Sequence, residues 1–236
     1  MMADVIQALW WGRMSTMEQL CAVSYMRNGH PFHLYVYGSA GNVPDGVVLK
    51  DGNEVVPETD IGAFSHLAQF ADWFRCNLLF KLGGVWVDMD TVCMRALDLP
   101  EPYLITEQHD RAGGFAVNNA YLKAPKGSKV MEWLINRCQA VRPEWKILPW
   151  EALGPALCLQ ATAKFSLPVR PAHEFNPIPW WNWDVLLKDS HTEFSLPPYA
   201  IHLWRAMWRS GLPHDPDRQY PRACLYERLK RRYLGA

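Results

Sequence analysis

Residues 65–92 read SHLAQFADWFRCNLLFKLGGVWVDMDTV, and this stretch decides the fold. Its first part places apolar side chains at the spacing of one helix face. The positions that share this face are Leu67, Phe70, Ala71, Phe74, Leu78 and Leu82. The Gly83–Gly84 pair then ends the helix, because glycine readily adopts the left-handed conformation just beyond a helix end. The apolar run VWV predicts a short strand, which puts Asp88 and Asp90 at its carboxyl end, where open α/β sheets bind ligands.

Upstream of this stretch, strand and helix patterns alternate. Residues 4–12 (DVIQALWWG) predict a strand. Ser15 and Glu18 have the Ser-x-x-Glu spacing of a capping box, which predicts a helix that runs to Gly29. Two further strands are expected at 32–38 and 46–51. Strand, helix and strand in this order predict a βαβ unit and the start of a parallel sheet.

Downstream, the pattern continues as a mixed α/β chain. The remaining expected elements are strands at 102–108 and 114–125, helices at 128–141 and 152–165, a strand within 199–208 that runs into a loop, and a terminal helix at 221–234. Residues 168–198 are rich in Pro and Trp and have little periodicity, so we expect irregular structure there. No internal repeat or linker composition divides the chain, and we expect one domain over residues 1–236.

Composition narrows the class of protein. The chain has 236 residues, 49% of them hydrophobic and 20% charged, which is typical of a globular domain with a substantial core. Lys plus Arg and Asp plus Glu both number 24, which gives no indication of a nucleic-acid-binding surface. The 6 cysteines include no CxxC pair, and we expect them to be reduced, buried thiols.

The ends of the sequence bear on location. The opening residues MMADVIQALWWGR lack the basic region and cleavage site of a signal peptide, and no apolar run reaches the length of a transmembrane helix. We therefore expect a cytoplasmic protein. The basic stretch ERLKRRYLGA at 227–236 allows at most peripheral contact with the inner face of a membrane.

Asp88 and Asp90 admit more than one chemistry. Two carboxylates at positions i and i+2 of a strand end point to the same side. Such a pair suits a hard cation such as Mg²⁺ or Mn²⁺, which prefers oxygen ligands and offsets the charge of a diphosphate. A bare Asp-x-Asp is also common in surface turns, so the neighbouring residues have to decide.

One alternative is phosphoryl transfer. The stretch VWVDMDTV resembles the opening motif of haloacid-dehalogenase-like phosphotransferases, in which Asp88 would be the nucleophile and Asp90 the acid/base. That family also needs a downstream lysine and a late acidic pair after an apolar strand. Neither is found in suitable context, since Asp215 and Asp217 in HDPDR follow no such strand.

The helix before the strand favours a different family. Asp72 and Arg75 lie three apart on one helix face, which alone would be an ordinary ion pair. With the Gly-Gly turn they complete the pattern D-x-x-R, seven residues, then G-G-x-W-x-D-x-D. This pattern resembles the DXD-containing sugar-binding region of retaining glycosyltransferases. The relatives include glycosyltransferase family 32, the initiating yeast mannosyltransferases, bacterial capsule enzymes and, more remotely, the glucosylating clostridial toxins.

The resemblance implies a GT-A fold, a nucleotide-sugar-binding Rossmann-like α/β fold with a central, mostly parallel sheet and added helices. It also implies roles for the matching residues. Asp72, Arg75 and Asp88 are the expected catalytic and donor-binding residues: the first two hydrogen-bond sugar hydroxyls, and Asp88 contacts the sugar or ribose. Asp90 binds the metal, with Asp88 beside it. Trp86 departs from the usual tyrosine, and tryptophan has no hydroxyl to donate.

Three further segments resemble the same family. Trp10 in LWWG takes the position of an aromatic residue that packs against the nucleotide base. Asn119 in NNAYLKAPKG would face the donor sugar. In AIHLWRAMWRSG, His202 is the candidate third metal ligand, while Trp204 and Trp208 form a candidate lid that contacts the donor.

Other aromatic and small residues have two interpretations each. The LGPAL stretch at 153–157 is similar to a segment near the acceptor site of such enzymes, although a proline in a first helical turn explains it equally. Trp180, Trp181 and Trp183 could stack on an acceptor sugar or belong to the core.

These observations predict a metal-dependent retaining glycosyltransferase. It would use Mn²⁺ or Mg²⁺ to move a hexose from a nucleotide-diphosphate sugar, with UDP favoured, to a glycan or lipid-linked saccharide. The family implies attack from the leaving-group side, with the departing phosphate helping to deprotonate the acceptor. Glu107 and Asp110 follow a predicted strand and are the remaining candidates for a separate base or nucleophile. The alternatives are the phosphotransferase that uses Asp88 and a non-catalytic transferase relic that binds glycans or a partner.

Overall fold

The computed structural model describes residues 4–149, 151–189, 192–209 and 214–235. Six strands form the central sheet in the order β3-β2-β1-β4-β7-β6. They are β1 (Ile6–Arg13), β2 (Phe32–Gly41), β3 (Val48–Asp51), β4 (Gly84–Val87), β6 (Leu104–His109) and β7 (Phe115–Ala124). The first four are parallel, and the β6–β7 hairpin adds antiparallel to β4. The expected α/β fold with a central, mostly parallel sheet is confirmed.

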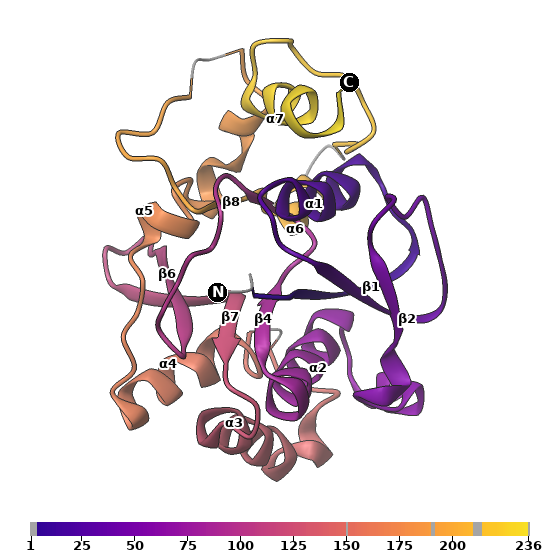
Figure 1. Cartoon of the computed structure of the whole chain (residues 1–236). Helices are drawn as coiled ribbons and strands as arrows, with labels where there is room; N and C mark the ends of the chain where they lie inside the picture. The colour runs from indigo at the N-terminus through magenta and orange to yellow at the C-terminus, as the bar shows by residue number, and fades with distance from the viewer. Residues whose placement is uncertain (1–3, 150, 190–191, 210–213, 236) are drawn as a thin grey trace.

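Helices cover both faces of this sheet. The longer ones are α1 (Thr16–Arg27), α2 (Leu67–Leu82), α3 (Lys129–Ala140), α4 (Pro155–Phe165) and α7 (Leu225–Leu234). Figure 1 shows α2, α3 and α4 on one side of the sheet and α1 and α7 on the other. Among the helices of the described residues, none has the length and hydrophobicity needed to cross a bilayer.

The core therefore has a layer on each side of the sheet, and β4 contributes to both. Val85 and Val87 belong to the cluster under α1, whereas Trp86 belongs to the cluster with α2, α3 and α4. Successive strand residues point to opposite faces, so a strand covered on both sides is apolar at every position. This explains why VWV has no polar residue.

The Gly-Gly turn joins α2 to β4 at close quarters. Gly83 and Gly84 have φ angles of 71° and 96°, in the region that favours glycine. A Cβ on Gly83 would lie 2.6 Å from the backbone nitrogen of Lys126, and one on Gly84 would lie 2.7 Å from Nε2 of Gln7. The turn thus needs glycine both for its conformation and for space. It directs the chain straight from the helix into the centre of the sheet.

The capping box is also present. Glu18 accepts a hydrogen bond from the Ser15 backbone nitrogen at 2.7 Å and caps the start of α1. The third layer of apolar residues lies between α1 and α7 and includes Leu20, Leu225 and Leu229.

The segment after residue 165 differs most from expectation. Its described part contains the short helices α5 (Ala172–Phe175) and α6 (Arg205–Trp208), with one 3-10 helix between them. Among the described residues, the 3-10 helices are η1 (Gly52–Glu54), η2 (Glu58–Ala63), η3 (Arg142–Glu144) and η4 (Trp180–Leu186). The late strand β8 (Ala200–His202) pairs with β5 (Thr91–Cys93) in a separate two-stranded sheet, and α6 stands where a loop was expected.

Candidate functional site

Strand β4 ends at Val87, and the two aspartates lie in the turn that follows. The backbone nitrogen of Asp88 donates to the carbonyl of Ala120 at 2.9 Å, and Oγ1 of Thr91 donates to the carbonyl of Asp88 at 2.8 Å. These bonds hold the turn at the carboxyl edge of the sheet. Because the strand stops first, the side chains of Asp88 and Asp90 are oriented by their partners rather than by strand alternation.

Arg75 is the centre of one half of the site. Its buried guanidinium lies 3.1 Å from Oδ1 of Asp88 and 3.3 Å from Oδ1 of Asp72, and it donates to the carbonyl of Asn119 at 2.5 Å. The same group lies 4.9 Å from the centre of the Trp86 ring. The structure therefore brings together these five residues from α2, β4, the turn after β4, and β7.

Trp86 contacts Asp88 through its indole nitrogen. Its indole Nε1 donates to Oδ1 of Asp88 at 2.9 Å. Asp88 consequently receives a neutral donor and a cationic donor on the same oxygen. The orientation of this carboxylate is set before any ligand enters.

Asp72 and Asn119 lie behind Arg75. Nδ2 of Asn119 donates to Oδ1 of Asp72 at 2.7 Å, and both side chains are buried. Burial raises the pKa of Asp72 to about 6, although the neighbouring Arg75 and the bond from Asn119 pull it down. Gly154, in the LGPAL stretch, packs on this pair: a Cβ there would lie 2.5 Å from Oδ2 of Asp72 and 2.6 Å from Nδ2 of Asn119. The position of Gly154 therefore requires glycine, and this requirement is what the LGPAL stretch contributes to the site.

Asp90 is the centre of the other half. Its Oδ2 accepts from the backbone nitrogen of Arg205 at 2.8 Å and lies 3.3 Å from Nε2 of His202. The β5–β8 pairing sets Thr91 opposite His202 and so carries the imidazole to the turn. Burial alone would raise the pKa of Asp90, but the adjacent His202 and the bond from Arg205 lower it below its ordinary value.

The two tryptophans of the late segment lie in different surroundings. Trp204 stacks on His202 with ring centres 3.8 Å apart, and it has a φ of 58°, a conformation uncommon for a large side chain. Trp208 is 1% exposed, donates to the carbonyl of Leu203 at 2.7 Å and packs against Tyr226. The structure thus gives Trp208 a core position and not that of a lid.

A cavity of about 410 Å³ opens between these halves. Of the residues singled out from the sequence, Trp10, Arg75, Trp86, Asp88 and Asp90 line it. Asp72, Asn119, His202 and Trp208 are not in its wall. Its lining residues come from β1, α2, β4 with the turn that follows it, and α6, the elements that Figure 1 labels.

Two arginines that sequence reasoning missed also line the cavity, Arg205 and Arg209. Both arginines follow His202 in the sequence, and they are four residues apart from each other. This spacing places two side chains on one helix face, so the pair could have indicated an anion site. Nε of Arg205 lies 3.2 Å from Oε1 of Glu18, whose side chain has no exposed surface. The capping residue of α1 thereby reaches the wall of the cavity.

The residues expected to hold a metal fit it in part. In the described ranges, no group of three or more His, Cys, Asp or Glu side chains is arranged around a common point. The 3.3 Å between Oδ2 of Asp90 and Nε2 of His202 is close to the roughly 3 Å that separates adjacent ligands of an octahedral Mg²⁺. Asp88 instead faces Arg75. Asp90 and His202 would therefore supply two ligands, which leaves the other positions to diphosphate oxygens and water, as is usual for this ion.

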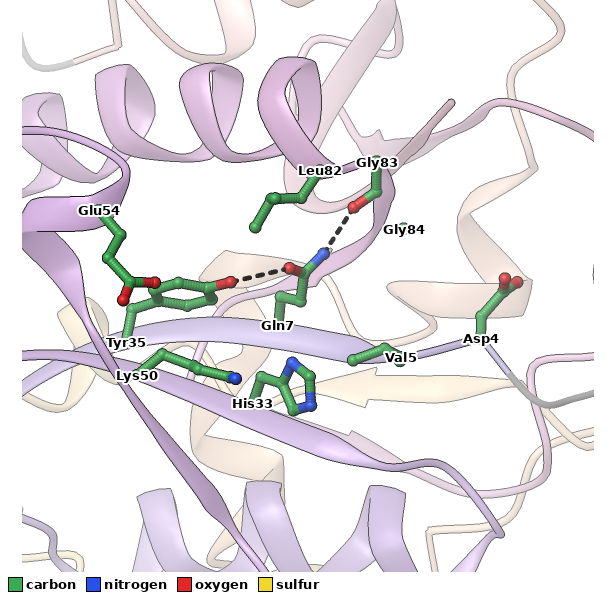
Figure 2. Close-up of a pocket in the computed structure, with 10 residues that line it drawn as sticks. All are labelled: Asp4, Val5, Gln7, His33, Tyr35, Lys50, Glu54, Leu82, Gly83 and Gly84. Atoms are coloured by element: carbon green, nitrogen blue, oxygen red, sulfur yellow. Dashed lines mark hydrogen bonds between the residues drawn. The ribbon is translucent and has the colours of Figure 1, made fainter. Parts of the chain in front are cut away.

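A second cavity, of about 520 Å³, lies at the opposite edge of the sheet, where the parallel strands begin. Figure 2 shows Gln7 at its centre, between Tyr35 and Gly83. Gln7 donates through Nε2 to the carbonyl of Gly83 at 2.7 Å and accepts from the Tyr35 hydroxyl at 3.3 Å. Neither Asp88 nor Asp90 lines this second cavity. The hydrogen bond from Gln7 to Gly83 instead supports the Gly-Gly turn that leads to Asp88.

Comparison with known families identifies the region that carries this site. Residues 17–109 match the model of the glycosyltransferase sugar-binding region containing the DXD motif. The match includes Asp72, Arg75, Trp86, Asp88 and Asp90.

Two curated relatives are lactosylceramide 4-alpha-galactosyltransferases. The Mus musculus protein is 23% identical and the Rattus norvegicus protein 24% identical, each over 155 residues that cover 58% of this chain. The chain spans about two fifths of the length of these relatives, since the match covers 41% of each.

Solved structures share the fold. The PaToxG glycosyltransferase superposes with a TM-score of 0.55 at 13% identity and covers 70% of both chains. The apo form of the glycosyltransferase GlyE of Streptococcus pneumoniae TIGR4 superposes with a TM-score of 0.51 at 12% identity, over 85% of this chain and 54% of its own. Over residues 17–109 the chain is thus similar to the DXD-containing sugar-binding region of glycosyltransferases, and its fold is shared with solved glycosyltransferase structures.

Proposed function

We propose that the protein is a retaining glycosyltransferase that moves a hexose from a nucleotide-diphosphate sugar, with a UDP-sugar favoured, to a hydroxyl of a glycan or lipid-linked saccharide. One observation carries the proposal. Arg75 orients Asp88 on one side of a cavity whose other side presents Asp90, Arg205 and Arg209. A sugar needs oriented hydrogen-bonding groups and a diphosphate needs positive charge, and this cavity offers them side by side.

The charged residues divide the donor between them. Arg205 and Arg209 suit the diphosphate, because guanidinium groups match phosphate oxygens. Trp10 offers a ring to the nucleotide base from the adjacent wall. Asp88 and Arg75 are left for the sugar and ribose hydroxyls, with Asp72 and Asn119 holding Arg75 from behind.

Asp90 and His202 would hold Mn²⁺ or Mg²⁺. When bound, this ion offsets the negative charge that develops on the departing diphosphate. Arg205, which is partly buried, adds to that effect, because fixed charges act more strongly there than in water.

In the reaction, the bond between the anomeric carbon and the diphosphate oxygen breaks, and the acceptor oxygen bonds to the same face of that carbon. The acceptor proton passes to the departing phosphate oxygen, so charge and protons balance. The cavity wall supports this route. Of the described residues that line it, the only carboxylates are Asp88 and Asp90, and both already accept strong donors. Neither is poised as a separate base or nucleophile.

The residues of the cavity wall do not favour phosphoryl transfer through Asp88. That chemistry needs a lysine beside the nucleophile, and no lysine is found among the described residues of the cavity wall. We also propose that the single domain acts in the cytoplasm, at most at the periphery of a membrane. All 6 cysteines are free and buried, as in proteins of reducing compartments.

A thermal-shift screen of UDP-, GDP- and ADP-sugars with and without Mn²⁺ tests the donor and the metal. A true donor raises the melting temperature by mass action, and we expect Mn²⁺ to increase that rise. NMR of the product then reports the anomeric configuration. Inversion would refute the retaining mechanism, and the absence of any nucleotide-sugar shift would refute the proposed function.

A further inference from the structure

The second cavity, at the edge of the sheet where the parallel strands begin, has a polar floor. Gln7 of β1 pairs with His33 of β2. Tyr35, two residues further along β2, pairs with Lys50 of β3. Paired residues, and residues two apart on a strand, point to the same face, so all four side chains lie on the side of the sheet that α2 covers. Helix α2 ends at Leu82, which leaves this end of the face open as a cavity of about 520 Å³ (Figure 2).

One part of the wall suits an anion. Figure 2 shows the Lys50 side chain directed toward the His33 ring. In the part of the chain that the structure describes, Lys50 forms no ion pair and the His33 ring forms no hydrogen bond. Burial and the charge of Lys50 both lower the pKa of His33, so at neutral pH the imidazole is uncharged and has one N–H to donate. Lysine and imidazole therefore offer a charge and a hydrogen bond to one anionic group.

The wall also contains two carboxylates, which restrict the charge of a ligand. Asp4 is paired with Lys123, whose Nζ lies 2.7 Å from its Oδ2. Glu54 is exposed, has no ion pair among the described residues and lies beside the Tyr35 ring (Figure 2). This glutamate repels a ligand with several negative charges, such as a nucleotide diphosphate. A ligand hydroxyl, by contrast, can donate a hydrogen bond to it.

The rest of the wall offers further hydrogen bonds and one apolar contact. Gln7 and Tyr35 are 3% and 2% exposed, and they bond to each other and to the carbonyl of Gly83. The second amide hydrogen of Gln7 and a lone pair of the Tyr35 oxygen are still free for the hydroxyls of a ligand. Leu82 lines the cavity, is 52% exposed and offers an apolar surface to the C–H face of a ring.

We propose that this cavity binds a small acidic sugar. Its one anionic group contacts Lys50 and His33, and its hydroxyls contact Glu54 and the floor of the cavity. A hexuronate and a hexose phosphate share this chemistry, and the volume lies in the range of small-molecule sites. The site is separate from the cavity beside the DXD turn. The two share no lining residue among those described, and they lie at opposite ends of β4, which spans about 13 Å. The inference therefore does not depend on glycosyl transfer.

Binding of small probes tests the site without a catalytic assay. Glucuronate and glucose 6-phosphate are the acidic sugars, glucose lacks the anionic group, and inorganic phosphate lacks the hydroxyls. Calorimetry should show that one acidic sugar or both bind about tenfold more tightly than glucose and phosphate, the value of one hydrogen bond to a charged group. In NMR titrations, with His33→Gln to assign the signal, the bound acid should raise the pKa of His33, because an anion stabilises the imidazolium. The acid that binds identifies the anionic group as carboxylate or phosphate.

Variants locate the ligand. Lys50→Met should weaken binding of the acidic sugar about tenfold, whereas Lys129→Met alters an exposed lysine of α3 outside the cavity and should leave it unchanged. Glu54→Gln should weaken the acidic sugar and strengthen inorganic phosphate, because the carboxylate accepts from hydroxyls and repels a bare anion. Opposite effects on two ligands exclude misfolding as their cause. Arg209→Met alters the other cavity and should have no effect.

Three results would overturn the inference: binding of neither acidic sugar, equal affinity for glucose, or an affinity that survives in Lys50→Met. Loss of binding in Arg209→Met would also contradict it, because the ligand would then lie beside the DXD turn. Serine is the remaining probe, a zwitterion without a sugar ring. If serine raises the pKa of His33 at a lower concentration than either acidic sugar, the cavity is an amino-acid site and the inference is wrong.

Discussion

Nε of Arg205 lies 3.2 Å from Oε1 of Glu18, a carboxylate with no exposed surface. Glu18 thus has two tasks: it caps α1 through Ser15, and it faces the arginine that lines the cavity beside the DXD turn. The backbone of that same arginine donates to Asp90 at 2.8 Å. Through Arg205, the buried Glu18 therefore connects the start of α1 both to the arginine-lined part of the cavity wall and to the DXD turn.

Glu18→Gln separates these tasks. Glutamine can still serve in a capping box, so the free energy of unfolding should change by less than about 1 kcal/mol. Without the opposing charge, Arg205 is no longer held in place, and the dissociation constant of the nucleotide diphosphate should rise about tenfold in calorimetry. Ser15→Ala is the control: it should cost about 1 kcal/mol of stability through the lost cap and leave nucleotide binding intact. A loss of stability in Glu18→Gln with unchanged nucleotide affinity would show that Glu18 acts only as a cap.

Gly154→Ala tests the contact behind Arg75. The added Cβ would lie within 2.6 Å of Asp72 and Asn119, so the pair has to separate. We expect a loss of about 1–3 kcal/mol of stability from overpacking and a fall in kcat of about a hundredfold from the displaced side chains. Gly62→Ala is the matched control, because a Cβ there meets nothing within 4 Å. Near-normal kcat in Gly154→Ala would mean that the position of Asp72 does not matter for transfer.

Asp72 should make stability depend on pH. Burial raises its pKa to about 6 from 3.8, so the folded protein binds more protons than the unfolded chain between these values. The stabilisation from the protonated carboxyl is fully present below about pH 4 and is lost as the pH rises through 6; above that pH the total loss is about 3 kcal/mol. In urea unfolding from pH 4 to pH 7, Asp72→Asn should remove this loss and gain stability relative to the wild type at pH 7. An identical pH profile in both proteins would contradict the buried, raised-pKa carboxyl.

Asp90→Asn and Asp88→Asn should fail in different ways. Asp90 faces His202, so its variant should lose the increase in donor affinity that Mn²⁺ causes, and chelation with EDTA should then change little. Asp88 faces Arg75 and Trp86, so its variant should retain the Mn²⁺ effect on nucleotide binding and lose at least a hundredfold in kcat. Thermal shifts and initial rates measure both. Loss of the Mn²⁺ effect in Asp88→Asn as well would make Asp88 a metal ligand, as the DXD pattern first suggested.

The local part of the site could be predicted from the sequence. Asp72 and Arg75 share a helix face, and the Gly-Gly turn joins that helix directly to the strand before Asp88, so their meeting needs only short-range geometry. The α/β class followed in the same way from periodicity and from glycine positions. These features depend on residues close in the chain.

The other half of the site depends on contacts between distant segments. The Asp72–Asn119 bond spans 47 residues and the Asp90–Arg205 bond spans 115. Periodicity cannot reveal which strands pair, and the pairing of Thr91 with His202 is what brings the late segment to Asp90. Trp208 illustrates the same limit, since a tryptophan in an irregular segment has the same sequence signal in a core as in a lid.

The sequence by itself determined the helix, the Gly-Gly turn, the strand and the carboxylates that end it, because backbone conformation and side-chain periodicity act over a few residues. Only the tertiary structure decided that Asp88 and Asp90 have separate partners, that Arg205 and Arg209 complete the cavity and that Glu18 faces Arg205. The physical reason is that burial, charge pairing and cavity shape arise where distant segments pack. No local pattern encodes that packing.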